Sequence, residues 1–90
     1  MTTRFPMVLI VWHDAHSGEG HWHSLDENDQ EPHIVETCGF LVGEVDGGKV
    51  NHVTVVQSVS PDLFADHTIY IPLKMVESLT FLQRFTAPFL

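Results

Sequence analysis

The chain has 90 residues, 43% of them hydrophobic, and a formal net charge of −8 from 12 acidic and four basic residues. This hydrophobic content is typical of a globular domain and argues against a disordered chain. The length accommodates one hydrophobic core, so we expect a single domain over 1–90, with its core in about 8–82 and an apolar tail at 83–90. Because a domain this small buries only about 60% of its unfolded surface, we expect an additional source of stability.

The charge excludes several partners. Affinity for nucleic acids rests chiefly on Lys and Arg side chains that neutralise phosphates, and the chain offers only Arg4, Lys49, Lys74 and Arg84. We therefore expect no DNA binding, and the charge disfavours RNA. An anionic membrane surface would repel the chain, and no segment approaches the ~20 apolar residues of a membrane span. We expect no membrane association.

Cysteine usage bears on both compartment and stability. Cys38 is the only cysteine, so no disulfide can form within the chain, and we expect a reducing, cytoplasmic compartment. Its neighbours Thr37 and Gly39 do not activate a thiol, which predicts a small buried strand residue. With disulfides excluded, oligomerisation and metal binding remain as sources of stability.

The N-terminal third predicts one strand followed by a polar loop. The apolar run 7–12 is rich in β-branched residues, which predicts a buried strand that continues to about His16. The stretch 17–32 contains glycines and then several acidic residues, which is typical of a solvated loop. Ser24 can begin a short helical turn there.

A bent strand and a hairpin are predicted next. Residues 33–45 are strand-like on both faces, and Gly39 and Gly43 within them indicate a bulge, a sharp bend or a close backbone approach. Asp46-Gly47-Gly48 predicts a hairpin turn. The partner strand is expected over 49–58, with core residues Val53, Val55 and Val56.

The C-terminal third predicts a short alternating strand over 67–71, ended by Pro72. The segment 73–85 is ambiguous, because Met75, Leu79 and Leu82 keep helical spacing while other residues alternate as in a strand. Five short strands in 90 residues favour a small barrel or sandwich, whose sheet keeps unpaired edges unless it closes or pairs with another chain.

Two segments resemble the motifs of Sm-like proteins. The first motif is matched by Gly39-Phe40-Leu41-Val42-Gly43, then Asp46, then Asn51 before Val53-Thr54-Val55; the second is matched by Ile69-Tyr70-Ile71-Pro72, then Met75-Val76 and Leu79. The opening Val11-Trp12-His13-Asp14-Ala15, with the later Trp22, is similar to small proteins of tailed phages (bacteriophage or cyanophage). The resemblance spans roughly 8–82.

This resemblance implies an all-β, strongly bent five-stranded barrel whose subunits pair edge strand to edge strand into a ring. Residues 75–82 then form the last strand, and we follow the resemblance over the helical spacing because periodicity is least reliable in short apolar runs. It also implies RNA contacts for Asp46 and Asn51, although both residue types are common in turns. The basic Arg-Gly pair of the second motif is absent; Thr68-Ile69-Tyr70 stands there.

Histidines suggest a different chemistry. His13, His16, His21 and His23 lie close together in the sequence, and His21 and His23 would share a face of an extended chain, as two metal ligands could. The alternative is a set of polar loop histidines. No His-Glu-x-x-His pattern, nucleophile elbow or glycine-rich phosphate loop is present, so we expect neither an enzyme nor a bound cofactor.

The resulting hypothesis is a phage-type Sm-like protein that forms a homo-oligomeric ring and acts as a scaffold or interaction module in the cytoplasm, that of the host cell if a phage encodes it. The alternative is an RNA-binding ring in which Lys49, or Lys74 and Arg84, gather from several subunits around a pore. Weaker alternatives are a phage virion component and a histidine-based metal-binding protein.

Overall fold

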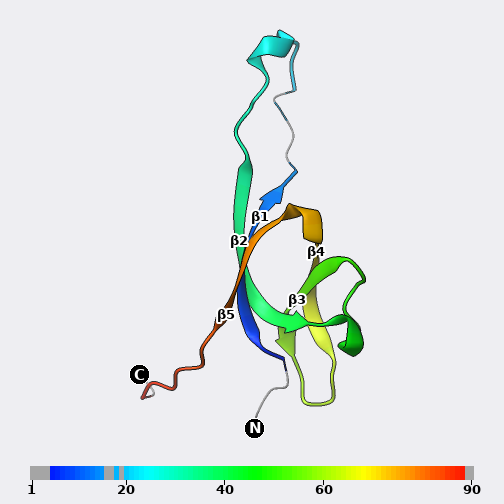
Figure 1. Ribbon diagram of the computed structural model, residues 1–90, viewed down its shortest axis with the longest axis vertical. Helices are drawn as coiled ribbons and strands as arrows, with labels where there is room; N and C mark the ends of the chain where they lie inside the picture. The colour runs from blue at the N-terminus through cyan, green and yellow to red at the C-terminus, as the bar shows by residue number, and fades with distance from the viewer. Residues whose placement is uncertain (1–4, 16–17, 19, 89–90) are drawn as a thin grey trace.

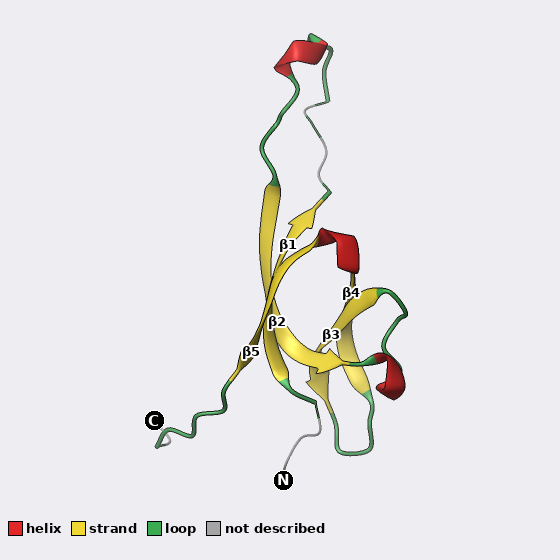
Figure 2. Cartoon of the chain, in the orientation of Figure 1, coloured by secondary structure: helices red, strands yellow, loops and turns green. Residues whose placement is uncertain are grey.

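The computed structural model describes residues 5–15, 18 and 20–88. These residues form five strands and three short 3-10 helices (Figures 1 and 2), in agreement with the all-β expectation. In chain order the elements are β1 (Met7–Asp14), η1 (Leu25–Glu27), β2 (His33–Val42), η2 (Glu44–Asp46), β3 (His52–Val59), β4 (Ala65–Pro72), η3 (Leu73–Met75) and β5 (Val76–Leu82).

All five strands belong to one antiparallel sheet with the order β4-β3-β2-β1-β5. The strand β5 confirms the assignment taken from the Sm resemblance over the helical spacing of the same residues. Leu79 explains the ambiguity: it packs against the core as a strand residue opposite Ile10 of β1. No pairing joins β4 to β5 among the described residues, so closure of the sheet into a barrel is not shown.

The long strand β2 bends between its two neighbours (Figure 2). Residues 33–40 pair with β1, and the last three residues, 40–42, pair with β3. Gly39 lies just before this change of partner, where a Cβ atom would clash with Cγ1 of Val55 and would lie 2.8 Å from the carbonyl oxygen of Val56. The glycine predicted to mark a bend or close approach therefore does so because only hydrogen fits there.

The core lies on the concave side of this bent sheet. Its buried residues come from β1, β3 and β4: Val8, Ile10, Val53, Val55 and Ile71, with Trp12, Leu41, Ile69, Val76 and Leu79 packed around them. The predicted core residues of β3 are confirmed, since Val53, Val55 and Val56 are all buried. Alternation along β1 places Val8 and Ile10 inward and Leu9 outward, as the pleat of a strand requires.

The prediction of a buried Cys38 is wrong. Cys38 pairs in register with Leu9, on the outer face of the sheet, whereas its neighbours Thr37 and Gly39 pair with the buried Ile10 and Val8. The sulfur is therefore exposed. The sequence misled because residues 38–42 are apolar on both strand faces, which leaves the inward face undecided until the partner strand is known.

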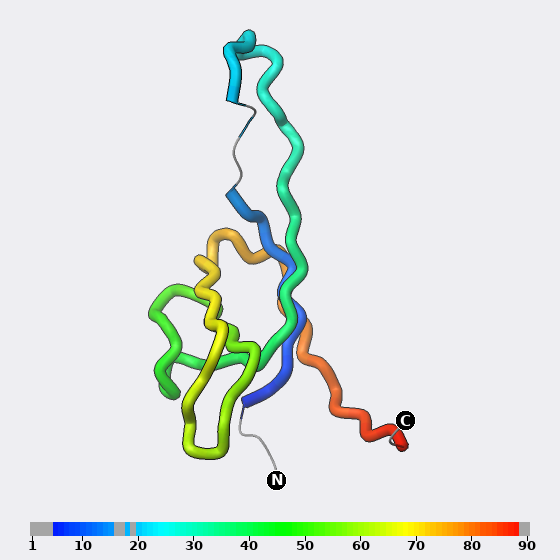
Figure 3. The backbone as a smooth tube through the Cα atoms, turned by 180° about the vertical axis from the view of Figure 1, so that it is seen from behind, coloured from blue at the N-terminus to red at the C-terminus, as the bar shows by residue number. Residues whose placement is uncertain are grey.

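A long arm extends beyond the sheet. The β1–β2 ladder ends at the pair Asp14 and His33, and residues 20–32, which we call the arm, project from that end (Figures 1 and 3). The longest extent of the chain is 57 Å and the shortest 21 Å. Within the arm, η1 confirms the helical turn predicted after Ser24. No described helix is long and apolar enough to cross a membrane.

Candidate functional site

The two edge strands carry exposed apolar side chains. Tyr70 of β4 is 51% exposed and Phe81 of β5 is 64% exposed. Further exposed apolar residues flank these strands or lie in them: Leu63, Phe64, Leu73, Met75 and Leu82. An edge strand also presents backbone N–H and C=O groups that can pair with another chain. Exposed apolar surface and free backbone groups together are the properties of a strand-pairing surface.

Charge and backbone geometry limit where such pairing can occur. In β5 the one charged residue is Glu77, whose Oε2 lies 3.0 Å from Nε2 of His13 on the neighbouring strand. In β4, His67 has a left-handed backbone (φ 52°), and its Nδ1 lies 3.0 Å from the Asp66 carboxylate. The regular, uncharged edge of β4 is therefore the short stretch 68–71.

The predicted RNA-contacting residues Asp46, Lys49 and Asn51 lie together in the connection between β2 and β3. This connection spans 43–51. The predicted hairpin is confirmed, since β2 and β3 are antiparallel neighbours and Gly47 has a positive φ (106°), but the loop is longer than the turn predicted at 46–48, and β3 begins at His52, later than the predicted Lys49. Two hydrogen-bonded turns lie in this connection: Gly47 N–H donates to the Glu44 carbonyl oxygen (3.2 Å), and His52 N–H donates to the Lys49 carbonyl oxygen (3.3 Å). Gly48 N–H donates to the Gly43 carbonyl oxygen (2.8 Å), and Lys49 N–H donates to Oγ1 of Thr54 (2.9 Å).

This connection lies against η3. The Leu73 N–H donates a hydrogen bond to the Asn51 carbonyl oxygen at 3.1 Å, and Asn51 adopts a left-handed backbone (φ 61°) that presents this oxygen. Two of the four basic residues consequently lie on neighbouring segments: Lys49 in the β2–β3 connection and Lys74 in η3. The Lys49 ammonium also lies 5.5 Å from the centroid of the Tyr70 ring, in cation–π range.

The four candidate metal-ligating histidines are only partly brought together. His13 lies on β1 and contacts Glu77, His16 lies outside the described residues, and His21 and His23 lie in the arm with ring centroids 6.4 Å apart. Among the described residues no three His, Cys, Asp or Glu side chains gather as a metal would require. The described geometry thus offers at most a pair of ligands in the arm.

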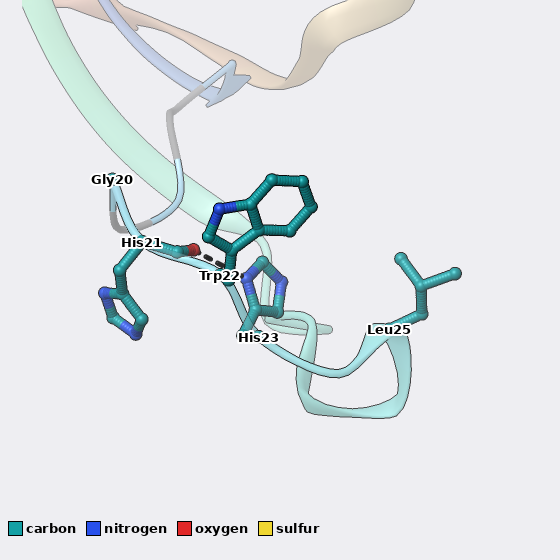
Figure 4. Close-up of a pocket in the computed structure, with 5 residues that line it drawn as sticks. All are labelled: Gly20, His21, Trp22, His23 and Leu25. Carbon is teal, nitrogen blue, oxygen red and sulfur yellow. Dashed lines mark hydrogen bonds between the residues drawn. The ribbon is translucent and has the colours of Figure 1, made fainter.

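The arm presents a feature that the sequence analysis did not resolve. Gly20, His21, Trp22, His23 and Leu25 line a shallow, open pocket, shown in Figure 4. The Trp22 side chain is 100% exposed, while Trp12, the other tryptophan, packs against the core and donates its indole N–H to Oγ1 of Thr37 (3.0 Å). Sequence alone could not separate the two tryptophans, because either one suits a packing role or a contact surface.

Local hydrogen bonds hold the arm. His23 Nε2 lies 2.6 Å from Oδ1 of Asn28, and its Nδ1 lies 3.3 Å from the His21 carbonyl oxygen. These two contacts, the Asn28 contact foremost, raise the pKa of His23 above its ordinary value, because both acceptors favour the protonated ring.

Comparison with known proteins found no matching family model, no matching curated protein and no matching solved structure.

Proposed function

We propose that the protein is a homo-oligomeric ring scaffold of the Sm-like type, in which β4 of one subunit pairs with β5 of the next. The observation that carries this proposal is the strand order β4-β3-β2-β1-β5, which leaves two unlike edges, each with exposed apolar side chains. Contacts between unlike surfaces run head to tail and close into a ring when the rotation between subunits permits.

The energetics support association. Fully burying a large apolar side chain contributes roughly 1.5–3 kcal/mol, and Tyr70, Phe81 and Leu82 are all exposed in the single chain. Pairing of 68–71 with β5 would add backbone hydrogen bonds in a water-excluded contact. Opposing these terms, each subunit brings a net charge of −8, so repulsion weakens assembly at low salt.

A charge placed on one edge tests the proposal. Phe81→Glu should leave the monomer folded, because this side chain is exposed in the single chain. It should prevent β5 from pairing with another subunit, since burying an unpaired carboxylate in that contact is strongly unfavourable. Phe85→Glu is the matched control, because Phe85 is 89% exposed and lies beyond β5. Light scattering coupled to size-exclusion chromatography should give monomers for Phe81→Glu and oligomers for wild type and Phe85→Glu. Identical masses for all three would refute edge pairing.

RNA binding is a second candidate. It is favoured by the hydrogen bond between Leu73 and Asn51, which joins η3, where Lys74 lies, to the β2–β3 connection, where Lys49 lies. In a ring, these two lysines would repeat in every subunit, which would offset part of the acidic charge locally. The residues proposed to contact RNA are Asp46, Lys49 and Asn51.

Fluorescence anisotropy with 12-nucleotide uridine-rich and adenine-rich RNAs at low salt tests this candidate. We expect saturable binding that the double variant Lys49→Ala/Lys74→Ala abolishes, with an affinity that falls as salt rises. Arg84→Ala is compared with the double variant, because the sequence also predicts Arg84 at the pore although Arg84 follows β5, away from Lys49 and Lys74 in the chain. A loss of binding equal to that of the double variant would move the RNA contact to the C-terminal segment. Absence of saturable binding by wild type at low salt would remove RNA binding from consideration.

A further inference from the structure

The arm carries two large apolar side chains into solvent. Trp22 is 100% exposed and Leu25 is 81% exposed, and neither belongs to the core or to an edge strand. A projecting segment that exposes a tryptophan differs from the scattered single apolar residues common on protein surfaces. Tryptophan is also among the residues most enriched in the energetic centres of protein–protein interfaces.

Hydrogen bonds within the arm fix the conformation around Trp22 and Leu25 in the single chain. Glu27 N–H donates to the Ser24 carbonyl oxygen at 3.0 Å, and Asn28 N–H donates to the Leu25 carbonyl oxygen at 3.2 Å, which closes η1. The contact between His23 and Asn28 links the residue after Trp22 to the far side of that turn. Figure 4 shows the Trp22 and Leu25 side chains on this short stretch, both extending to the same side of the backbone in this view. Such preorganisation lowers the entropy lost on binding.

Charge selects the partner. The arm contains Asp26, Glu27, Asp29 and Glu31 and no lysine or arginine. RNA, DNA and anionic lipid surfaces are repelled by this set. Pairing of two arms is also disfavoured, since each arm would bring these carboxylates and no lysine or arginine to the other. A basic protein surface can complement the carboxylates of the arm, and an apolar pocket on that surface can bury the Trp22 indole. Interfaces commonly combine an apolar centre with a polar or charged rim in this way.

We propose that the arm is a docking element for a basic partner protein, with Trp22 as the apolar anchor and the surrounding carboxylates as the rim. The inference goes beyond ring assembly, because the arm lies away from both edge strands and would dock from a monomer as well as from a ring (Figure 1). Ring formation would add only repetition of the arm and hence avidity.

A selection experiment tests this. A random 12-residue peptide library is selected on immobilised wild-type protein, with the Trp22→Ala variant used to remove sequences that bind elsewhere. We expect enrichment of peptides that combine net positive charge with aromatic or aliphatic residues. Failure to enrich any sequence over Trp22→Ala, or enrichment of acidic or neutral sequences, would overturn the proposal.

The affinities of the enriched peptides for variants of the protein then measure the contribution of Trp22 separately from that of the surrounding carboxylates. Trp22→Ala should weaken binding at least about 30-fold, as expected for an interface anchor. Phe85→Ala, which removes an aromatic side chain that is 89% exposed and lies outside the arm, should change the affinity less than about twofold. Asp26→Asn/Glu27→Gln should weaken binding and reduce its salt dependence. Equal losses for Trp22→Ala and Phe85→Ala would overturn the proposal, and so would Trp22-dependent binding of 12-nucleotide RNA or phosphatidylglycerol vesicles in place of the peptides.

Measuring the solution mass of each variant distinguishes failure of ring assembly from failure of docking on the arm. Phe81→Glu should bind the peptides with unchanged affinity per subunit while losing assembly, and Trp22→Ala should keep its assembly while losing the peptides. Loss of peptide binding in Phe81→Glu would contradict the claim that the arm binds its partner independently of ring assembly.

Discussion

Gly39 of β2 and Val55 of β3 approach so closely that a Cβ atom at position 39 would clash with Cγ1 of Val55. This contact lies where β2 passes from β1 to β3, and it brings the two halves of the sheet over a common core. A side chain at position 39 would not fit at this bend unless β3 shifted.

Gly39→Ala should consequently destabilise the protein by about 2–3 kcal/mol, because the β3 backbone must shift to make room for a methyl group in a packed interior. Urea unfolding at a fixed protein concentration measures this change. Gly43→Ala is the matched control, because that glycine has φ −70° and open space around its Cβ position. Equal effects of the two substitutions would show that the close contact does not determine the bend.

The hydrogen bond from the Trp12 indole to Thr37 predicts a second stability effect. Thr37→Val preserves the shape of the side chain but leaves the partly buried indole N–H without its acceptor, which should cost about 1–2 kcal/mol. Thr37→Ser keeps the hydroxyl and should recover most of that loss. Unfolding monitored by Trp fluorescence checks both variants, and a Val variant as stable as wild type would mean that this hydrogen bond contributes nothing.

The protonation of His23 should depend on Asn28. Its folded-state pKa lies above the unfolded value, so its contribution to the stability of the arm is present below the unfolded pKa and lost as pH rises through the folded pKa. An NMR titration of the His23 ring should give a higher pKa in the native protein than in urea. Asn28→Ala should move the native pKa down towards the urea value; an unmoved pKa would contradict the contact.

Salt should strengthen subunit association. Each subunit carries a net charge of −8, and mobile ions screen repulsion between subunits while leaving burial of apolar edge residues intact. Sedimentation velocity at roughly 0.05 M and roughly 0.5 M sodium chloride, about one decade of ionic strength, should show a shift towards the oligomer at the higher concentration. Dissociation at high salt would indicate an interface held by ion pairs instead of apolar strands.

The sequence predicted most of the fold because strand signals here are strong. The apolar run of β1, the valines of β3 and the alternation of β4 located strands that carry the core, and the two glycines expected to mark a bend or close approach include Gly39, where the bend lies. Two local errors share a cause: the face of Cys38 and the length of the 43–51 connection depend on which residues the neighbouring strand places opposite. Register between strands is a long-range property, and a pattern within one strand cannot specify it.

The candidate sites were harder to predict than the fold. Asp46, Lys49 and Asn51 are close in the sequence, so their common location was predictable, but the hydrogen bond that brings η3 beside them joins residues 22 positions apart (73 against 51). The exposure of Trp22 was unpredictable for the same reason: a polar loop can fold back on a sheet or project from it, and composition is alike in both cases.

The solution mass of the wild-type chain at micromolar concentration tests the central claim most directly. Edge pairing of β4 with β5 predicts a discrete oligomer of the 10.2 kDa subunit by native mass spectrometry and sedimentation equilibrium, stable to dilution through this range. A folded monomer at the same concentration would contradict the ring.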